Sequence, residues 1–339
     1  MPPERFVVDP QHPDASVIAE ASSRLLRGEL VAFPTETVYG LGARADRADA
    51  VARIFAAKGR PAWNPLIVHV TDLVAAQGLV CEVTPVAELL AARFWPGPLT
   101  LVMPRDPARV PDAVTGGGPT VALRAPAHPV ARALLAAAGV PVAAPSANRF
   151  QSVSPVTATH VMKSLRDREL TVLDGGRCAH GIESTVLDLT REAPTVLRHG
   201  ALSVASLRAV IPTLRVEVGV REGDTASPGT ASPGTAARHY APGCAVWVVD
   251  RDAVPEARAA MAAAHGEPVM VLRIGAGEAA RGVRWLPADP EGYAAALYEA
   301  LHAVEDADAV ALVVEAPPSS AGWEAVRDRL QRAAAPARR

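Results

Sequence analysis

The sequence predicts an α/β protein built around two sheets, and three observations support this prediction. Short apolar, strand-like segments share residues 1–212 with helices, and several strands follow one another directly, as in a large mixed sheet. Residues 213–243 end in a stretch rich in Gly, Pro, Ser and Thr that cannot bury a core. Residues 244–339 alternate strands with helices, which is typical of a small, parallel, Rossmann-like domain. We therefore expect an α/β domain, a linker and a second α/β domain over these three ranges.

Each element of the first range is predicted from its own pattern. Residues 16–30 and 48–59 have the apolar spacing of a helix, and Gly59 is a helix stop signal. The segment PTETVYGLG, residues 34–42, follows a strand and is expected to be irregular. We expect further helices at 86–94 and 128–139, and strands at 30–33, 65–70, 98–103, 120–125, 141–144, 170–173, 184–189 and 195–198.

The second domain is predicted in the same way. Its buried-strand patterns lie at 244–250, 268–274 and 309–315, and its helical patterns at 254–266, 293–307 and 323–334. The glycine-containing segment GAGEAARG lacks the third glycine of a dinucleotide-binding turn, so we expect an ordinary turn there. The linker repeats the five residues ASPGT and ends in RHYAPG, and we expect it to be flexible or extended.

Composition excludes several classes of protein. The 339 residues are 49% hydrophobic and 21% charged, which suits a folded core rather than a disordered chain. No apolar run reaches the ~20 residues that span a bilayer, and the N-terminus lacks a signal sequence, so we expect a cytoplasmic protein. Three cysteines without a CxxC pair exclude a zinc ribbon and argue against a disulfide framework. A net charge of −2 gives no general nucleic-acid-binding surface.

Several well-known catalytic motifs are absent from the sequence. It contains no GxxxxGK[ST] phosphate loop, no GxSxG elbow and no HExxH zinc motif. The nine histidines show no dependable metal-ligand spacing, and the pair His180 and Glu183 lies in a glycine-rich loop where a structural role is favoured. We therefore predict no protein-bound metal.

Polar side chains instead follow apolar strands. Thr35, Glu36, Thr37 and Tyr39 come after the strand at 30–33 and precede two glycines that allow a ligand to approach the backbone. Arg124 ends another strand, where its guanidinium can bind a carboxylate through two hydrogen bonds, although a surface ion pair is the alternative.

Two further segments suit an anion. Only two of the 34 basic residues are lysines, and one of them, Lys58, flanks a helix end together with Arg60 on a proline-stiffened turn. Such cations fit a polyphosphate, and equally fit the negative end of a helix dipole. The small-residue turn APSAN presents backbone N–H groups and the Ser146 hydroxyl, which can hold an anion without a phosphate loop.

These segments are individually weak signals, but their order is specific. PTETVYGLG, KGRPAWNPLIVH, WPGPLT, VALRAPAHP, APSAN, GIESTV and VLRHG together resemble the YrdC/Sua5 family of L-threonylcarbamoyladenylate synthases over about residues 12–212. The linker and second domain fit the longer, Sua5 type. The resemblance implies a YrdC-like twisted mixed sheet with a large, positively lined central cavity. It also implies synthesis of threonylcarbamoyl-AMP from L-threonine, bicarbonate and ATP, with release of pyrophosphate, for the t6A modification of tRNA.

Site residues follow from the resemblance by motif. The threonine pocket is expected to contain Thr37, His69, Arg124, Ala144 and Ser184. The ATP side is expected to contain Lys58, Arg60, Asn64, Thr120, Ser146, Asn148, Ser154, Arg198, His239 and Tyr240. Lys58 and Arg60 are the expected catalytic residues, because they would neutralise phosphate charge. Mg²⁺ is expected to arrive with ATP, and the product to pass to a tRNA threonylcarbamoyl-transfer complex, with weak tRNA contact.

Three other interpretations remain open from the sequence. An RNA-binding module or a nucleotide-binding regulator of the same fold would lack the chemistry. A carbamoyl-transfer domain of the hydrogenase-maturation type would carry acylphosphatase and zinc-finger segments, and neither is visible.

The linker departs from the family pattern, since Ala237 stands where an aromatic residue is common and ASPGT is duplicated. As a hypothesis, this linker acts as a substrate-gated lid.

Overall fold

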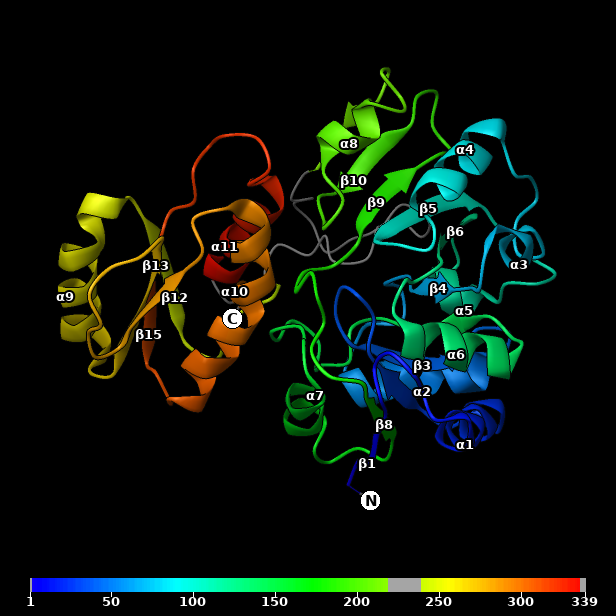
Figure 1. Cartoon of the computed structure of the whole chain (residues 1–339), viewed down its shortest axis with the longest axis horizontal. Coiled ribbons are helices and arrows are strands. Elements are labelled where there is room, and N and C mark those ends of the chain that lie inside the picture. The colour runs from blue at the N-terminus through cyan, green and yellow to red at the C-terminus, as the bar shows by residue number, and fades with distance from the viewer. Residues whose placement is uncertain (1, 219–238, 336–339) are drawn as a thin grey trace.

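The computed structural model describes residues 2–218 and 239–335, and these form two α/β units (Figure 1). The first contains an eleven-stranded mixed sheet and the second a four-stranded parallel sheet, counted over the described residues. The expected fold class is therefore confirmed. The boundaries at 212 and 243 stay predictions, and the ASPGT repeats and Ala237 lie outside the described residues.

The large sheet has the strand order β1-β8-β2-β3-β7-β4-β6-β5-β9-β10-β11. Its strands are β1 (Glu4–Val7), β2 (Val31–Phe33), β3 (Gly40–Arg44), β4 (Ile67–His69), β5 (Leu99–Pro104), β6 (Thr120–Arg124), β7 (Val142–Ala143), β8 (Thr171–Asp174), β9 (Thr185–Asp188), β10 (Thr195–Arg198) and β11 (Arg215–Val216). Strands β4 and β6 are parallel, and the pairings through β5 and β9 give β10 the same direction. The carboxyl ends of these three strands therefore point the same way.

Helices cover both faces of this sheet. They are α1 (Ala15–Leu26), α2 (Ala48–Lys58), α3 (Leu73–Gln77), α4 (Pro85–Phe94), α5 (Asp112–Thr115), α6 (Pro129–Ala138), α7 (Ala158–Ser164) and α8 (Val204–Arg208). Because side chains alternate along a strand, Val31 and Phe33 of β2 pack with α1 and α6, whereas Ala32 packs in the core on the other face, which includes α2. Both faces of the sheet's centre are thus buried, which explains why its central strands are largely apolar, whereas the edge strands β1 and β11 are mostly exposed.

One prediction for this domain was wrong. The end of PTETVYGLG is not irregular but forms β3, which is antiparallel to β2 and β7. A side chain at Gly42 would lie 2.8 Å from the Phe33 ring and 3.0 Å from Val142, so only glycine lets the strand pass there. The short strands β1 and β11 and the helices α3, α5 and α8 were not predicted.

The second unit is a parallel sheet of order β12-β15-β13-β14. Its elements are β12 (Ala245–Val249), a 3₁₀ turn η1 (Arg251–Ala253), α9 (Val254–His265), β13 (Val269–Ile274), β14 (Val283–Leu286), α10 (Pro290–Asp306), β15 (Ala311–Glu315) and α11 (Glu324–Ala334). The three predicted strands and three predicted helices are confirmed, and β14 is an addition after the turn.

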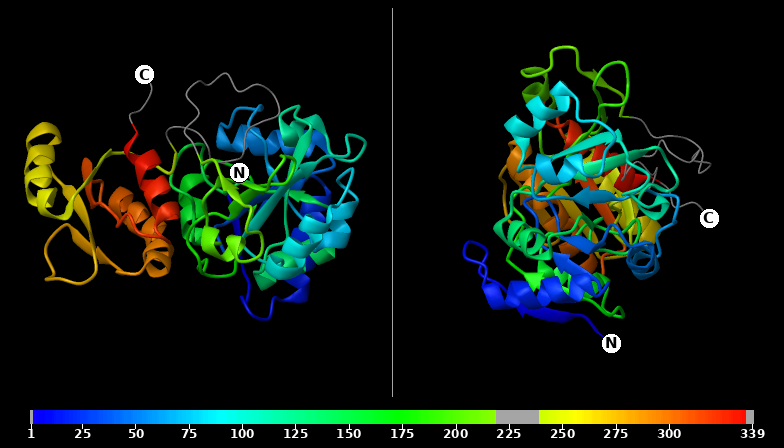
Figure 2. Two further views of the ribbon diagram at one scale, coloured as in Figure 1. Left: turned by 90° about the horizontal axis from the view of Figure 1, so that it is seen from above. Right: turned by 90° about the vertical axis from the view of Figure 1, so that its right-hand side faces the viewer.

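Helices α10 and α11 lie between the small sheet and the first domain, whereas α9 lies on the far face (Figures 1 and 2). Leu297 and Leu301 of α10 belong to the same continuous core as residues of the first domain. The two units therefore share buried apolar surface. Among the described residues, no helix is both long and apolar enough to span a membrane.

Candidate active site

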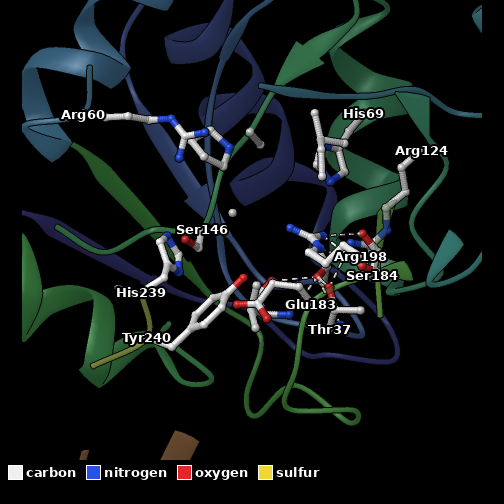
Figure 3. Close-up of a pocket in the computed structure, with 16 residues that line it drawn as sticks. Thr37, Arg60, His69, Arg124, Ser146, Glu183, Ser184, Arg198, His239 and Tyr240 are labelled. Atoms are coloured by element: carbon white, nitrogen blue, oxygen red, sulfur yellow. Dashed lines mark hydrogen bonds between the residues drawn. The ribbon is translucent and has the colours of Figure 1, made fainter. Parts of the chain in front are cut away.

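A cavity of about 50 Å³ lies in the first domain, and the last residues of the linker help to line it (Figure 3). Figure 3 shows Arg60, Ser146, His239 and Tyr240 on one side, and His69, Arg124, Ser184 and Thr37 on the other. The lining residues are Thr35, Thr37, Val38, Gly40, Arg60, Ile67, His69, Arg124, Ala144, Pro145, Ser146, Glu183, Ser184, Arg198, His239 and Tyr240. All five residues expected in a threonine pocket are among them.

Arg124 ends β6 and is held in place by buried partners. It donates from Nη2 to Glu36 Oε1 at 2.6 Å and from Nη1 to Thr37 Oγ1 at 2.9 Å. The other Glu36 oxygen accepts the backbone N–H of Ala127 at 2.9 Å. Burial raises the pKa of Glu36, but the Arg124 charge and the hydrogen bonds from Arg124 and the backbone together outweigh burial, and the net shift is downward. Glu36 therefore stays ionised and fixes the arginine against the cavity wall.

His69 ends β4 and is aligned with Arg124 in the parallel ladder. Its ring packs edge-on against Phe33, and its Nδ1 atom is buried with no hydrogen-bond partner among the described residues. Burial, assisted by the Arg124 charge, lowers the pKa of His69 to about 3. The imidazole is therefore neutral, with one nitrogen left for a ligand.

Ser184 and Arg198 meet because β9 and β10 are antiparallel. Arg198 donates from Nη2 to the Ser184 carbonyl at 2.9 Å and to Ser184 Oγ at 3.2 Å. The same hydroxyl lies 2.7 Å from Thr100 Oγ1. Arg198 thus lies between the serine at one end of the cavity and the cations at the other.

Lys58 is the last residue of α2, which ends because Gly59 takes a left-handed conformation with φ of 66°. Its Nζ atom donates to the backbone carbonyls of Ser146, at 2.5 Å, and of Asn148. Burial and the nearby Arg60 hold the pKa of Lys58 well below its usual value. The lysine braces the APSAN turn from behind, and it does not line the cavity directly.

Arg60 follows two residues later and does reach the cavity wall. It donates to Asn64 Oδ1 at 2.6 Å and to the Pro65 carbonyl at 2.9 Å, so the proline-stiffened turn orients it. Burial lowers the pKa of Arg60 to about 9. Within the described residues, neither Lys58 nor Arg60 forms an ion pair with a carboxylate. Buried cations without acidic partners destabilise the free protein and favour a bound anion.

His239 and Tyr240 enter the cavity from the last residues of the linker. Tyr240 has a left-handed backbone with φ of 60°, and the two rings contact edge-on with centroids 4.0 Å apart. Tyr240 Oη and His239 Nδ1 are both buried and have no hydrogen-bond partner among the described residues. Burial and four surrounding cations, Arg60 first, hold the pKa of His239 well below its usual value. These unpartnered polar atoms face the region that a ligand would occupy.

Not every predicted residue reaches the wall of the cavity. Asn64 orients Arg60, and Asn148 donates to the Ser152 carbonyl at 2.8 Å and thereby braces its turn. Ser154 donates to Glu183 at 2.7 Å from behind the wall. Thr120 begins β6, at the opposite end of the strand from Arg124, and is not among the lining residues.

Glu183 is a lining residue that the sequence analysis assigned to a structural role. Its carboxylate accepts hydrogen bonds from Ser154, Tyr298 and Arg329. The last two belong to the second domain, and no local sequence pattern connects them with Glu183. The described residues hold no group of three or more His, Cys, Asp or Glu side chains placed to bind a metal.

Comparison with known proteins gives two family matches. Residues 23–200 match the Sua5/YciO/YrdC model, described as "Telomere recombination", and residues 202–335 match the model described as "Threonylcarbamoyl-AMP synthase, C-terminal domain". The chain is 41% identical to a Pyrococcus abyssi threonylcarbamoyl-AMP synthase, over 92% of each chain. It is 44% identical to the Bacillus subtilis protein of the same name, over 66% of this chain and 64% of that one.

Solved structures agree with these matches. The crystal structure of P. abyssi Sua5 complexed with L-threonine matches with a TM-score of 0.90, 38% identity and 97% coverage of both chains. A variant of that protein with adjacent histidine and tyrosine replaced by alanine matches with a TM-score of 0.89 and 38% identity, over 97% of this chain and 96% of that one. Both domains of this chain are covered. The chain therefore belongs to the Sua5/YrdC family, in its two-domain branch whose curated members are named threonylcarbamoyl-AMP synthases.

Proposed function

We propose that this enzyme makes threonylcarbamoyl-AMP from L-threonine, bicarbonate and ATP and releases pyrophosphate. One observation carries the proposal. A single cavity joins a fixed arginine suited to a carboxylate, Arg124, to a buried cation, Arg60, and Lys58 lies behind the same wall. Neither Lys58 nor Arg60 has a carboxylate partner among the described residues. The wall therefore carries groups that can recognise an amino acid at one end and a polyphosphate at the other. At about 50 Å³ the cavity is smaller than the large one that the resemblance implies, and it would have to widen when both substrates bind.

L-threonine fits the Arg124 end of the cavity. The guanidinium would bind the substrate carboxylate, while the Thr37 and Ser184 hydroxyls contact its polar end. The neutral His69 ring beside Arg124 offers a hydrogen bond without adding charge. Ala144 leaves room at this end because its side chain is small. The threonine complex of the P. abyssi relative supports this substrate.

ATP fits the opposite end of the cavity. Arg60 and Arg198 would contact the phosphates, and Ser146 with its turn would bind an anionic oxygen. Lys58 would act through that turn, which it holds by two backbone carbonyls. Asn64, Asn148 and Ser154 would orient these groups rather than touch the nucleotide. His239 and Tyr240 would cover it from the linker side.

The reaction needs alignment more than a protein nucleophile. The threonine amine and bicarbonate first form a carbamate and release water. A carbamate oxygen then attacks the α-phosphorus of ATP, the bond to the β-phosphate breaks, and pyrophosphate leaves with its negative charge. Holding both reactants in one cavity removes much of the entropic barrier, and buried cations stabilise the developing charge.

Mg²⁺ would enter the cavity as part of the nucleotide substrate. The cavity wall carries one carboxylate among the described residues, Glu183, and that group already accepts three hydrogen bonds. These residues do not fit a protein-held Mg²⁺, which prefers free oxygen ligands. The ion would therefore enter and leave with the phosphates.

The product is a mixed anhydride that serves as a threonylcarbamoyl donor. We propose that it passes to a tRNA threonylcarbamoyl-transfer complex for t6A formation, in the cytoplasm where ATP and tRNA are present, with at most weak tRNA contact by this chain. The names of the curated relatives favour this enzyme over a regulator of the same fold.

Pyrophosphate release tests the proposal. The purified full chain is incubated with MgATP and bicarbonate, with L-threonine, without amino acid, or with L-serine as the control. We expect release that depends on both threonine and bicarbonate. Pyrophosphate release that needs neither threonine nor bicarbonate would contradict the proposal. So would the absence of pyrophosphate release from folded protein that binds ATP.

A further inference from the structure

The second domain supplies most of the donors to a carboxylate on the cavity wall. Arg329 of α11 donates from Nε to Glu183 Oε2 at 3.0 Å, and Tyr298 of α10 donates to the same oxygen at 2.9 Å. The first domain contributes Ser154, at 2.7 Å from Oε1. The Arg329 side chain is 0% exposed, so this ion pair is fully buried. The second domain therefore completes the wall of a cavity that lies in the first.

The same two residues hold Tyr240. The Arg329 guanidinium carbon lies 5.0 Å from the centroid of the Tyr240 ring, and the Tyr298 ring stacks on that ring at 5.7 Å with an interplanar angle of 27°. One residue before, the His239 N–H donates to the Arg332 carbonyl of α11 at 3.3 Å. The linker residues that enter the cavity, His239 and Tyr240, are thus seated on α10 and α11.

We propose that Arg329 is a positioning residue for the synthase reaction. It holds Glu183 in the cavity wall and Tyr240 at the nucleotide side, and so makes ATP binding depend on the seating of the second domain. The inference rests on the proposed function for its substrates. The contacts on which it rests are independent of that function.

Charge explains why an arginine is needed here. Burial alone raises the pKa of Glu183, and the Arg329 charge, helped by Arg198, reverses that shift. Without Arg329 the carboxylate would keep only the two neutral hydroxyl donors, in a site where an unpaired charge is costly. Tyr240 would at the same time lose the cation over its ring. Both effects would loosen the same wall.

The test compares four full-length variants. Arg329→Gln removes the charge, and Arg329→Lys keeps the charge but lacks the planar group over Tyr240. Tyr298→Phe removes one hydroxyl and keeps the ring stack. Arg327→Gln is the matched control, because Arg327 lies on the same helix but donates to the Pro318 and Ser320 carbonyls. The readouts are KM for ATP, the dissociation constant for L-threonine, and hydrogen exchange of residues 239–243.

We expect Arg329→Gln to raise KM for ATP by about 2- to 30-fold, the range found for residues that couple through a contact network. Threonine affinity should stay within about twofold, because the Arg124 end is untouched, and exchange at 239–243 should accelerate. Arg329→Lys and Tyr298→Phe should show smaller effects in the same direction, and Arg327→Gln should match the wild type.

Wild-type KM for ATP and wild-type exchange in folded Arg329→Gln would overturn the proposal. If Arg329→Gln does not fold, wild-type KM for ATP and wild-type exchange in both Arg329→Lys and Tyr298→Phe would overturn the proposal. A wild-type enzyme without synthase activity would refute the proposed function alone. In that case hydrogen exchange of residues 239–243 still tests the positioning role. Unchanged exchange in Arg329→Gln would contradict that role, and faster exchange would support it.

Discussion

Arg124 and Glu36 form a buried ion pair, with Nη2 2.6 Å from Oε1, at the end of the cavity that we assign to L-threonine. The arginine is therefore oriented and neutralised before any substrate arrives. Replacing Arg124 leaves Glu36 buried without its main partner, so binding and stability change together. This relationship gives the first prediction and also shows how to separate the two effects.

We expect Arg124→Met to raise KM for L-threonine by roughly 10- to 150-fold, because a hydrogen bond to a charged group contributes about 1.5–3 kcal/mol. The variant should also lose about 3–5 kcal/mol of unfolding free energy from the unpaired Glu36. Adding Glu36→Gln should restore most of this stability without restoring threonine use. Threonine titrations and urea unfolding measure both. Normal threonine use by the double variant would refute the assignment.

The cations at the other end give the second prediction. We expect Arg60→Ala or Lys58→Ala to lower kcat/KM for ATP by about 10²- to 10³-fold, as for removal of one charge-stabilising donor. Wild-type protein at 100 times Kd of ATP should gain about 2.7 kcal/mol of stability. Thermal melts of either variant should show little of this gain. Arg47→Ala, which removes a surface cation paired with Asp49, serves as control. A nucleotide response like that of the wild type would count against the assignment.

The buried hydroxyl of Tyr240 gives the third prediction. Because Tyr240 Oη has no hydrogen-bond partner among the described residues, Tyr240→Phe should leave stability unchanged or slightly higher. Turnover should fall by about tenfold if a neutral hydrogen bond to substrate is lost. Tyr293 offers a matched control. Its hydroxyl is also buried and unpartnered within the described residues, but its ring packs on Trp323 and away from the cavity. Equal loss of activity in Tyr240→Phe and Tyr293→Phe would show that the effect is not specific to the site.

A histidine pair across the domain interface gives a prediction about pH. His160 of α7 stacks on His302 of α10 with ring centroids 3.7 Å apart. Burial lowers the pKa of His160 to about 4, with a further contribution from His302. Lys163 and Arg177 act in the same direction, and Asp306 opposes them.

The direction in which pH changes the stability follows from proton uptake. The unfolded chain binds a proton at His160 near pH 6.5, whereas the folded chain binds it near pH 4, so stability falls as pH drops through this window. We expect His160→Gln to flatten the pH dependence of the urea midpoint between pH 7 and 5. His12→Gln, at an exposed position, should not change it. Identical slopes for wild type and His160→Gln would contradict this account.

Local patterns were sufficient to predict most of the first domain and its polar strand ends. Arg124, His69 and Arg198 each close a strand, and the three strands run in one direction, so their last residues converge. Thr120 shows where the pattern fails. It lies in the same strand as Arg124 but about 13 Å away along it, at about 3.3 Å per residue. It therefore lies at the amino end of β6, away from the cavity.

The contacts of Glu183 could not be predicted from the sequence for a different reason. Its partners Tyr298 and Arg329 are separated from it by 115 and 146 residues. They reach it only because α10 and α11 pack on the first domain. A buried arginine late in an amphipathic helix has the same sequence pattern as a solvated one, so only the fold reveals that this helix helps to build the site.

The most direct test asks whether threonine and the carbon of bicarbonate are joined to AMP in one product. The enzyme is incubated with MgATP, L-threonine and isotopically labelled bicarbonate, and the nucleotide products are separated and weighed by mass spectrometry. We expect one adenylate that contains threonine and the labelled carbon, formed by the wild type and lost in both Arg60→Ala and Arg124→Met. An adenylate without the labelled carbon, or equal product from the wild type and the two variants, would contradict the claim that this cavity joins threonine, bicarbonate and ATP.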